Sequence, residues 1–221
     1  MTLGDSAALR PAKRFAAAGR RDALLDAAER LVAEKGLLGA SLQEIGAAVG
    51  LAPYAVRAQF GNFDMVIEAV LDRHLDRLID RIGAYQAHLE ADADPAARLV
   101  HAVTSLLDML AAYAGGQRVH VAAWSGASPH LVRTLTLRQR HLAYFYAGLI
   151  AAAVPEAEDN ELAMPAALSL LGMASWHVLW FRERGALARA EYARMLANML
   201  TEGVRASARQ GIGSWEAPVD G

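Results

Sequence analysis

The 221-residue sequence contains no cysteine. It therefore has no disulfide framework, no thiolate zinc site and no cysteine nucleophile, and it fits a reducing, cytoplasmic compartment. A large excess of one charge is also lacking, because 22 Lys and Arg stand against 24 Asp and Glu. The whole chain is thus not a general polyanion binder, although a local basic surface can still bind DNA. With 54% hydrophobic residues, the chain is expected to form a globular core.

The sequence also lacks the short motifs of common enzymes. Its seven histidines are scattered, without an H-E-x-x-H or a zinc-ligand spacing. It has no G-x-S-x-G, phosphate-binding loop or dinucleotide glycine pattern. We interpret Gly115-Gly116 as a turn, and Glu156 and Glu158 as solvated acids in a loop. We therefore expect no enzyme, no cofactor and no metal, while an active site without a linear motif stays open as an alternative.

No secretory signal is visible in residues 1–21, but one later segment has the length of a membrane span. Leu162 to Phe181 is uncharged over 20 residues. It contains Pro165, His177 and two tryptophans, and no basic flank precedes it. We interpret it as a buried helix of a soluble protein with no membrane partner.

Helical periodicity runs through most of the chain and predicts an all-α fold. The first stripe consists of Leu24, Ala27, Ala28, Leu31 and Val32, and Lys35-Gly36 supplies a stop. Further helices are predicted over residues 62–91, 95–114, 118–125, 129–154, 160–184 and 188–209. The expected parts are a basic flexible arm (1–20), a helix-turn-helix domain (21–65), a helical effector and dimerisation domain (66–210) and a tail (211–221). The boundary near residue 65 is expected inside a continuous helix.

Residues 41–60, SLQEIGAAVGLAPYAVRAQF, predict two short helices joined by a turn. Ser41 and Glu44 form an S-x-x-E capping box, which begins the first helix. Gly50 suits a turn with a positive φ, and Pro53 suits the first position of the second helix. The predicted core contacts are Leu42, Ile45, Val49, Val56 and Phe60. A longer amphipathic helix precedes the pair, as in a helix-turn-helix, whose second helix lies in the major groove of double-stranded DNA.

The candidate DNA contacts comprise this second helix, the start of the first and a basic segment before them. Residues 10–21 hold five Lys and Arg and no acid, so they form either a solvated leader or an arm that reaches phosphates. Residues 1–65 carry eight Lys and Arg against seven Asp and Glu. Phosphate binding would therefore depend on the arm, on Arg57 and on helix N-termini. The candidates are Lys13, Arg14, Arg20, Arg21, Ser41, Gln43, Ala52, Pro53, Tyr54, Arg57 and Gln59.

Residues 21–66 resemble the DNA-binding domain of the TetR family of bacterial regulators. The resemblance rests on RRDALLDAAERLVAEKG, on SLQEIGAAVG, on the short helix ending at Phe60, and on Asp64 and Val66 at the opening of a long helix. It covers about a fifth of the chain. It implies a homodimeric repressor of transcription that a small-molecule effector releases from a roughly palindromic operator. It also implies that the long helix from residue 62 transmits the effector's influence to the DNA-reading helices.

Three positions depart from the pattern of that family. The second short helix begins at Ala52, where the family usually has Ser or Thr. Arg57 replaces the usual Tyr and Phe63 replaces the usual Lys, and both usual residues typically contact phosphate in that family. Arg57 can still bind a phosphate or a guanine, whereas Phe63 cannot pair with a phosphate.

Aromatic and polar-tipped side chains recur at helical spacing in the larger domain. Such stripes are often ordinary core. Trp, Tyr and His also combine an apolar body with one polar tip, which suits a pocket for an apolar or aromatic small molecule. The candidate ligand contacts are Met109, Tyr113, His120, Trp124, Tyr144, Met173, Trp176, His177 and Trp180.

The last two predicted helices carry residues suited to a homodimer. Small residues such as Ala163, Ala167 and Gly172 allow close helix approach. Further apolar surface comes from Leu187, Ala190, Tyr192, Met195, Leu196, Met199 and Leu200. Two helices from each protomer would form a four-helix interface, with packing inside one chain as the alternative.

Three functions follow from these patterns and stay open at this point. The first is the DNA-binding regulator. The second is a helical ligand-binding or scaffolding dimer whose DNA-binding head has lost its operator contacts, which the departures at Ala52 and Phe63 favour. The third is a helical enzyme without a linear motif.

Overall fold

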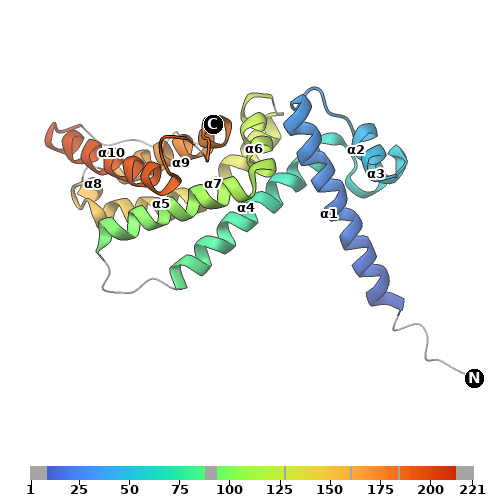
Figure 1. Cartoon of the computed structure of the whole chain (residues 1–221), viewed down its shortest axis with the longest axis horizontal. Helices are drawn as coiled ribbons and strands as arrows, with labels where there is room; N and C mark the ends of the chain where they lie inside the picture. Colours follow the sequence, from blue (N-terminus) through green and yellow to red (C-terminus); the bar gives the residue numbers. More distant parts are fainter. Residues whose placement is uncertain (1–8, 88–93, 127, 160, 184, 213–221) are drawn as a thin grey trace, which may run out of the picture. The chain divides into compact units, whose positions relative to one another are not determined.

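The computed structural model describes residues 9–87, 94–126, 128–159, 161–183 and 185–212, and every regular element within them is helical (Figure 1). The predicted all-α class is confirmed. The helices are α1 (Leu9–Lys35), α2 (Leu42–Ala48), α3 (Pro53–Phe60), α4 (Phe63–Ala87), α5 (Pro95–Ala112), α6 (Ala114–Gly126), α7 (Pro129–Ala153), α8 (Glu156–Asp159), α9 (Ala163–Trp180) and α10 (Arg189–Arg209). Their contacts divide the chain into a first unit, residues 1–73 with 118–132, and a second unit, residues 74–117 with 133–221.

In the first unit, α1 begins at Leu9, where the sequence analysis expected a flexible arm over residues 1–20. Pro11 is tolerated because the amides of a first helical turn have no helical acceptor, and the alanines that follow favour a helix. The predicted apolar stripe is buried, each member being at most 9% exposed: Leu24, Ala27, Ala28, Leu31 and Val32. Gly36 ends the helix as predicted, with a φ of 74° and its N–H donating to the Val32 carbonyl at 2.9 Å.

In the second unit, α5 is a central helix that packs against α10 and α9 (Figure 1). α5 buries one face that includes Leu99, Leu106 and Leu110, while α10 buries Tyr192 and Leu196. At the start of α10, the Arg189 guanidinium donates to the Asp108 carboxylate of α5 at 2.6 Å and pairs with Glu183. The buried apolar faces and this ion pair together fix how α10 lies on α5.

Two expected irregular segments are helical in the structure, so those interpretations were wrong. Gly115-Gly116 lies in the first turn of α6 rather than in a turn between helices. Gly116 packs against His74 of α4, where an added Cβ would lie 2.9 Å from Nδ1, so close packing explains this glycine better than a turn does. Residues 156–159 form α8, because the apolar Ala157 is fully buried and draws the segment onto the unit.

α9 is the one helix in the described part of the chain with the length and apolarity of a membrane span. We expected it to be buried, yet only 33% of its residues are buried within this chain. The exposed side chains gather toward its C-terminal half and include Trp176, Leu179 and Trp180. Core helices of soluble proteins also have this length and composition. An exposed apolar face of this kind is typical of an interaction surface.

Candidate nucleic-acid interface and ligand cavity

The start of α2 is fixed by Ser41 and Glu44 and by Lys35 at the end of α1, and the predicted helix start at Ser41 is confirmed. The Ser41 hydroxyl accepts the Glu44 N–H at 3.3 Å and donates to the Glu44 carboxylate at 2.9 Å. Lys35 donates to the other carboxylate oxygen at 2.5 Å. This hydrogen bond lowers the pKa of the Glu44 carboxyl, which therefore stays charged and holds α1 and α2 together at neutral pH.

The turn between α2 and α3 depends on two glycines. Gly50 has a φ of 70°, which confirms the predicted positive φ. The Leu51 N–H donates to the Gly46 carbonyl at 2.8 Å and closes the end of α2. A Cβ at Gly46 would lie 2.7 Å from the Leu51 carbonyl oxygen and 3.0 Å from Val56, so only glycine lets the turn fold back onto α2.

α3 has one buried and one solvent-facing side, as a recognition helix requires. Val56 and Phe60 are buried and confirm the predicted core contacts, and Pro53 stands in the first turn as predicted. Ala52, at the N-cap, makes no side-chain capping bond. The exposed residues of α3 and its N-cap include the candidates Ala52, Pro53, Tyr54, Arg57 and Gln59, with Tyr54 79% exposed.

The other candidate DNA contacts lie around this helix pair. Gln43 is exposed and Ser41 half-buried, and both line a hollow of about 500 Å³ together with Arg57 and Phe63. Arg20 is exposed at the surface of α1. The exposed Arg21 places its guanidinium 4.8 Å from the centre of the Phe60 ring, so it also stabilises the end of α3. The side chains of Lys13 and Arg14 lie outside the described residues, and all of these DNA contacts remain predictions.

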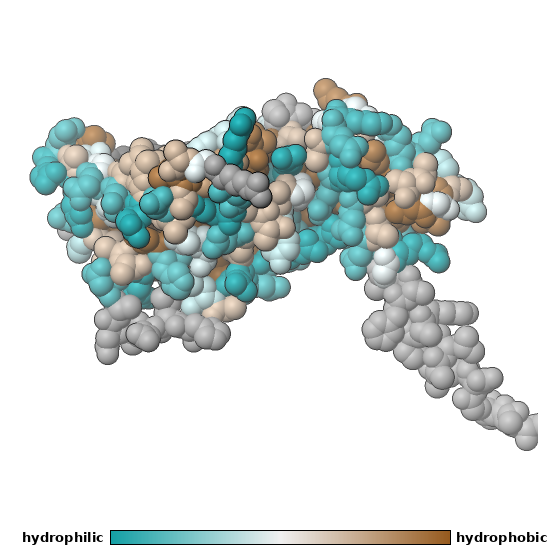
Figure 2. All heavy atoms as spheres, in the orientation of Figure 1, coloured by the Kyte–Doolittle hydropathy of each residue, from teal (hydrophilic) through white to brown (hydrophobic). Residues whose placement is uncertain are grey.

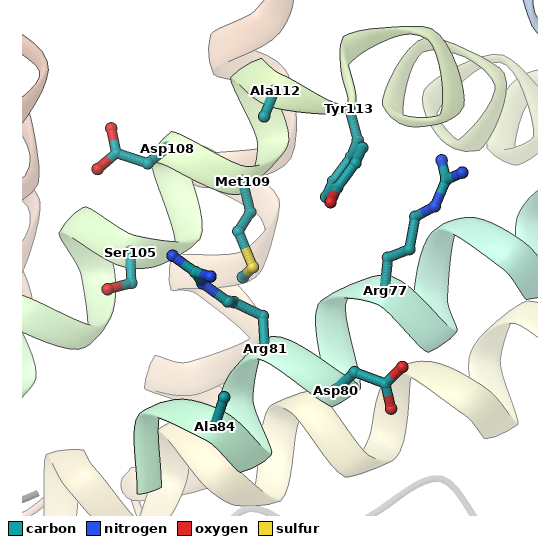
Figure 3. Close-up of a pocket in the computed structure, with 9 residues that line it drawn as sticks. All are labelled: Arg77, Asp80, Arg81, Ala84, Ser105, Asp108, Met109, Ala112 and Tyr113. Atoms are coloured by element: carbon teal, nitrogen blue, oxygen red, sulfur yellow. The ribbon is translucent and has the colours of Figure 1, made fainter. Parts of the chain in front are cut away.

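The second unit contains a cavity of about 520 Å³ between α4 and α5 (Figure 3). One wall carries two arginines of α4, and the other carries Met109 of α5 and Tyr113, the residue that caps the C-terminus of α5. Its lining residues are Arg77, Asp80, Arg81, Ala84, Ser105, Asp108, Met109, Ala112 and Tyr113. The volume is in the range of small-molecule sites.

The candidate ligand contacts do not form one cluster. Met109 and Tyr113 line the cavity. Tyr144, Trp176 and Trp180 are more than half exposed at the surface of the second unit, His177 is buried against Phe181, and Met173 is half-buried. His120 and Trp124 belong to the first unit, where the Trp124 indole N–H donates to the His120 Nε2 at 3.3 Å. The ligand role of all nine residues stays a prediction.

The sequence analysis missed the cationic wall of the cavity. The sequence does carry a signal for this wall, because Asp-Arg pairs recur every four residues in α4, at residues 72–73, 76–77 and 80–81. Residues four apart share one helix face, so Arg77 and Arg81 face the same side. The guanidinium of Arg77 lies 4.9 Å from the centre of the Tyr113 ring.

A surface of exposed apolar side chains covers parts of α9 and α10 in the second unit, among polar ones (Figure 2). Its members are Leu168, Trp176, Leu179, Trp180, Met195 and Met199. A groove of about 230 Å³ between the two helices includes Met199 and Gly203. Of the predicted interface residues, Tyr192, Leu196 and Leu200 pack inward instead.

Known proteins match this chain over most of its length. A family model described as "Tetracyclin repressor-like, C-terminal domain" matches residues 92–204. The HTH-type transcriptional repressor KstR2 of Rhodococcus jostii (strain RHA1) is 24% identical over 193 residues, which are 84% of this chain and 91% of that protein.

Solved structures share the fold. The structure of AibR in complex with isovaleryl coenzyme A and operator DNA has a TM-score of 0.67 at 21% identity, covering 82% of this chain and 98% of AibR. A TetR-family regulator from Bordetella parapertussis 12822 has a TM-score of 0.70 at 19% identity, covering 81% and 93%.

Proposed function

This chain belongs to the TetR family of DNA-binding transcriptional regulators, whose C-terminal model matches over half of it, and we propose that it is a homodimeric repressor that a small molecule releases from a palindromic operator. One observation carries this proposal most directly. It is the helix α3, buried through Val56 and Phe60 and exposed through Tyr54, Arg57 and Gln59. Its position after a glycine turn is the layout that delivers a helix to the major groove.

Arg57 is the cation of the α3 surface and is exposed there. A guanidinium on a recognition helix binds either a phosphate or the O6 and N7 atoms of guanine. Tyr54 and Gln59 flank it on the same exposed helix, and both offer hydrogen bonds to base edges or phosphates. Because Phe63 provides no charge, we assign to Arg57 a larger share of the electrostatic affinity than one cation normally has.

The apolar surface of α9 and α10 supports a dimer of this chain. Its exposed tryptophans, leucines and methionines would be buried by a second copy. Two helices from each protomer form a four-helix interface, a common way to close a two-fold dimer. Two-fold symmetry then requires two recognition helices, about one DNA turn or a multiple apart, and hence a palindromic operator.

The cavity between α4 and α5 supports effector binding, and two features connect it to the rest of the protein. α4 is unbroken from Phe63 to Ala87. It follows α3 directly in sequence, and residues of its C-terminal half line the cavity. Asp108 lines the cavity and accepts from Arg189 at the start of α10. An effector that favours another position of α4 or α5 would therefore change the affinity for DNA. Repression in the cytoplasm, without catalysis, is part of this proposal.

Selection of bound sequences from a random DNA pool with the purified full chain tests this function. We expect enrichment of two inverted half-sites whose centres are separated by about one helical turn or a multiple. The variant Arg57→Ala should enrich the same pool far less, whereas Arg133→Ala, which removes an exposed arginine of α7, should behave as the wild type. A pool without enrichment, or with single half-sites only, would refute the operator or the dimer, respectively.

A further inference from the structure

The two arginines that face the cavity differ from Arg73 of the same helix in having no carboxylate partner among the described residues. Asp76, which precedes Arg77 in sequence, pairs with Arg138 of α7 at 3.1 Å. Within the described residues, no carboxylate oxygen lies within 4.0 Å of the guanidinium of Arg77 or Arg81. Arg81 is exposed and Arg77 half-buried, so water reaches both guanidiniums, and both can exchange that water for a ligand of opposite charge.

The two acids of the cavity do not neutralise these arginines. The Asp108 carboxylate accepts from Arg189 at 2.6 Å, on the side of α5 that faces α10. Figure 3 shows the Asp80 carboxylate pointing away from Met109 and Tyr113. The inner side of the cavity therefore presents positive charge from α4.

The opposite wall is suited to an apolar group. Met109 is buried, and its thioether faces the cavity between the two arginines in Figure 3. Ala112 and Tyr113 extend this wall, and Arg77 stacks on the Tyr113 ring at 4.9 Å from its centre. This stacking restrains the guanidinium and keeps its positive charge beside the Tyr113 ring. Ser105 also lines this side, but Figure 3 shows its hydroxyl pointing away from Met109 and Arg81.

We propose that this cavity binds a small organic oxyanion, a carboxylate or phosphate ester with an apolar body. Arg81 binds the oxyanion, because a guanidinium offers a planar pair of N–H donors to a carboxylate or a phosphate. Arg77, whose guanidinium lies on the other side of Met109 and Tyr113 in Figure 3, adds positive charge to the site. Met109 and Tyr113 contact the apolar body. The inference rests on the proposed function, in which this cavity is the effector site, and it adds a negative charge to a ligand that sequence analysis expected to be only apolar or aromatic.

Calorimetric titration of the full chain with matched probes tests the charge requirement. The probes are octanoate, octyl phosphate and octanol, with phenylbutyrate and phenylbutanol as an aromatic pair. We expect at least one oxyanion to bind about tenfold or more tightly than the alcohol of the same body. Comparing octanoate with octyl phosphate shows which oxyanion the site prefers. Equal binding of acid and alcohol, or no saturable binding of any oxyanion, overturns the proposal.

Variants then locate the site. Arg81→Met should weaken oxyanion binding about tenfold to a hundredfold, and Arg81→Lys should restore part of it. The matched control Arg133→Met removes an exposed arginine of α7 and should bind as the wild type. Circular dichroism checks that Arg81→Met is folded. Unchanged oxyanion binding by both Arg77→Met and Arg81→Met refutes the assignment.

Selection of DNA from the random pool separates the regulator proposal from the oxyanion proposal. A wild-type chain that selects DNA but does not discriminate acid from alcohol refutes only the oxyanion. A chain that discriminates them but selects no DNA refutes the regulator and leaves the ligand class standing.

Discussion

The two ends of α4 use the same local sequence in different ways. In the first unit, Arg73 is 13% exposed and binds carboxylates of α1, at 2.8 Å from Asp26 and 2.5 Å from Glu29. In the second unit, Arg77 stacks on a tyrosine and Arg81 faces a cavity. The helix opposite decides the difference, because α1 presents acids, whereas α5 and its C-cap present Met109 and Tyr113. An Asp-Arg repeat therefore fixes a helix at one end, and at the other it leaves two arginines without carboxylate partners among the described residues.

The structural end of this comparison is tested by Arg73→Met. The substitution keeps an apolar stem but leaves the half-buried Glu29 without its cation. We expect the free energy of unfolding to fall by about 3 kcal/mol, at the lower limit for a broken buried ion pair because Asp22 and Asp26 are mostly exposed. Urea denaturation followed by circular dichroism measures it. The control Arg133→Met should change the value by less than about 0.5 kcal/mol, and an equally small loss in Arg73→Met would show that the cluster is only a surface feature.

Two helical glycines, one in each unit, extend the comparison to the effect of an added Cβ. Gly46→Ala places a Cβ 2.7 Å from the Leu51 carbonyl oxygen in the first unit, and a backbone atom cannot move aside cheaply. We expect a loss of about 2 kcal/mol and a lower affinity for DNA, because α3 must shift. Gly148→Ala in α7 meets nothing within 4 Å and should stabilise the protein by about 0.5 kcal/mol through helix propensity. Thermal melts of both variants check the signs, and equal effects would contradict the packing argument.

The sequence predicted the first unit in more detail than the second. Capping and turn residues act locally, so Ser41, Gly50 and Pro53 located α2 and α3 within a short stretch. α1 begins at Leu9, inside the segment whose charge had suggested an arm, because the helix propensity of its alanines extends the helix. Gly116 was misassigned because its reason, contact with His74, involves a residue far away in sequence.

The ligand cavity was harder to predict for the same reason. Aromatic stripes identified Met109 and Tyr113, but they equally selected Trp176 and Trp180, which lie on the exposed face of α9. Whether an aromatic side chain lines a cavity or a surface depends on the helix packed beside it, which periodicity does not reveal. The arginines that line the cavity were readable as a repeat, yet only their lack of partners separates Arg81 from Arg73.

His74, the residue after Arg73, is a buried polar side chain of the second unit. Its Nε2 lies 2.8 Å from the Gln117 amide oxygen, and burial lowers the pKa of His74 to about 4, with a smaller effect of Arg77. The folded pKa is below the unfolded value of about 6.5, so this stability is complete above pH 6.5 and lost as pH falls towards 4. We expect the free energy of unfolding to drop by about 2 kcal/mol between pH 7 and 5 from this residue.

Denaturation at several pH values measures this fall in the free energy of unfolding for the wild type and for two variants. His74→Gln cannot be protonated and should show a flatter profile than the wild type, while His177, whose pKa burial also lowers, leaves a residual slope. His141→Gln removes an exposed histidine of α7 and should keep the wild-type profile. Parallel profiles for wild type and His74→Gln would show that His74 is hydrated or that its pKa is close to the ordinary value.

The smallest expected effect concerns the one exposed arginine of α3. Arg57 differs from Arg73 in the same unit because it is exposed, and we propose that it supports DNA binding rather than folding. Arg57→Ala should leave the free energy of unfolding within about 0.5 kcal/mol and weaken operator binding about tenfold, with the salt slope reduced by about one. Fluorescence anisotropy at several salt concentrations separates the possibilities. A lower affinity with an unchanged slope assigns Arg57 to a base edge rather than a phosphate, and unchanged affinity removes it from the interface. If Arg57→Ala instead unfolds the unit, the division between folding and binding arginines is wrong.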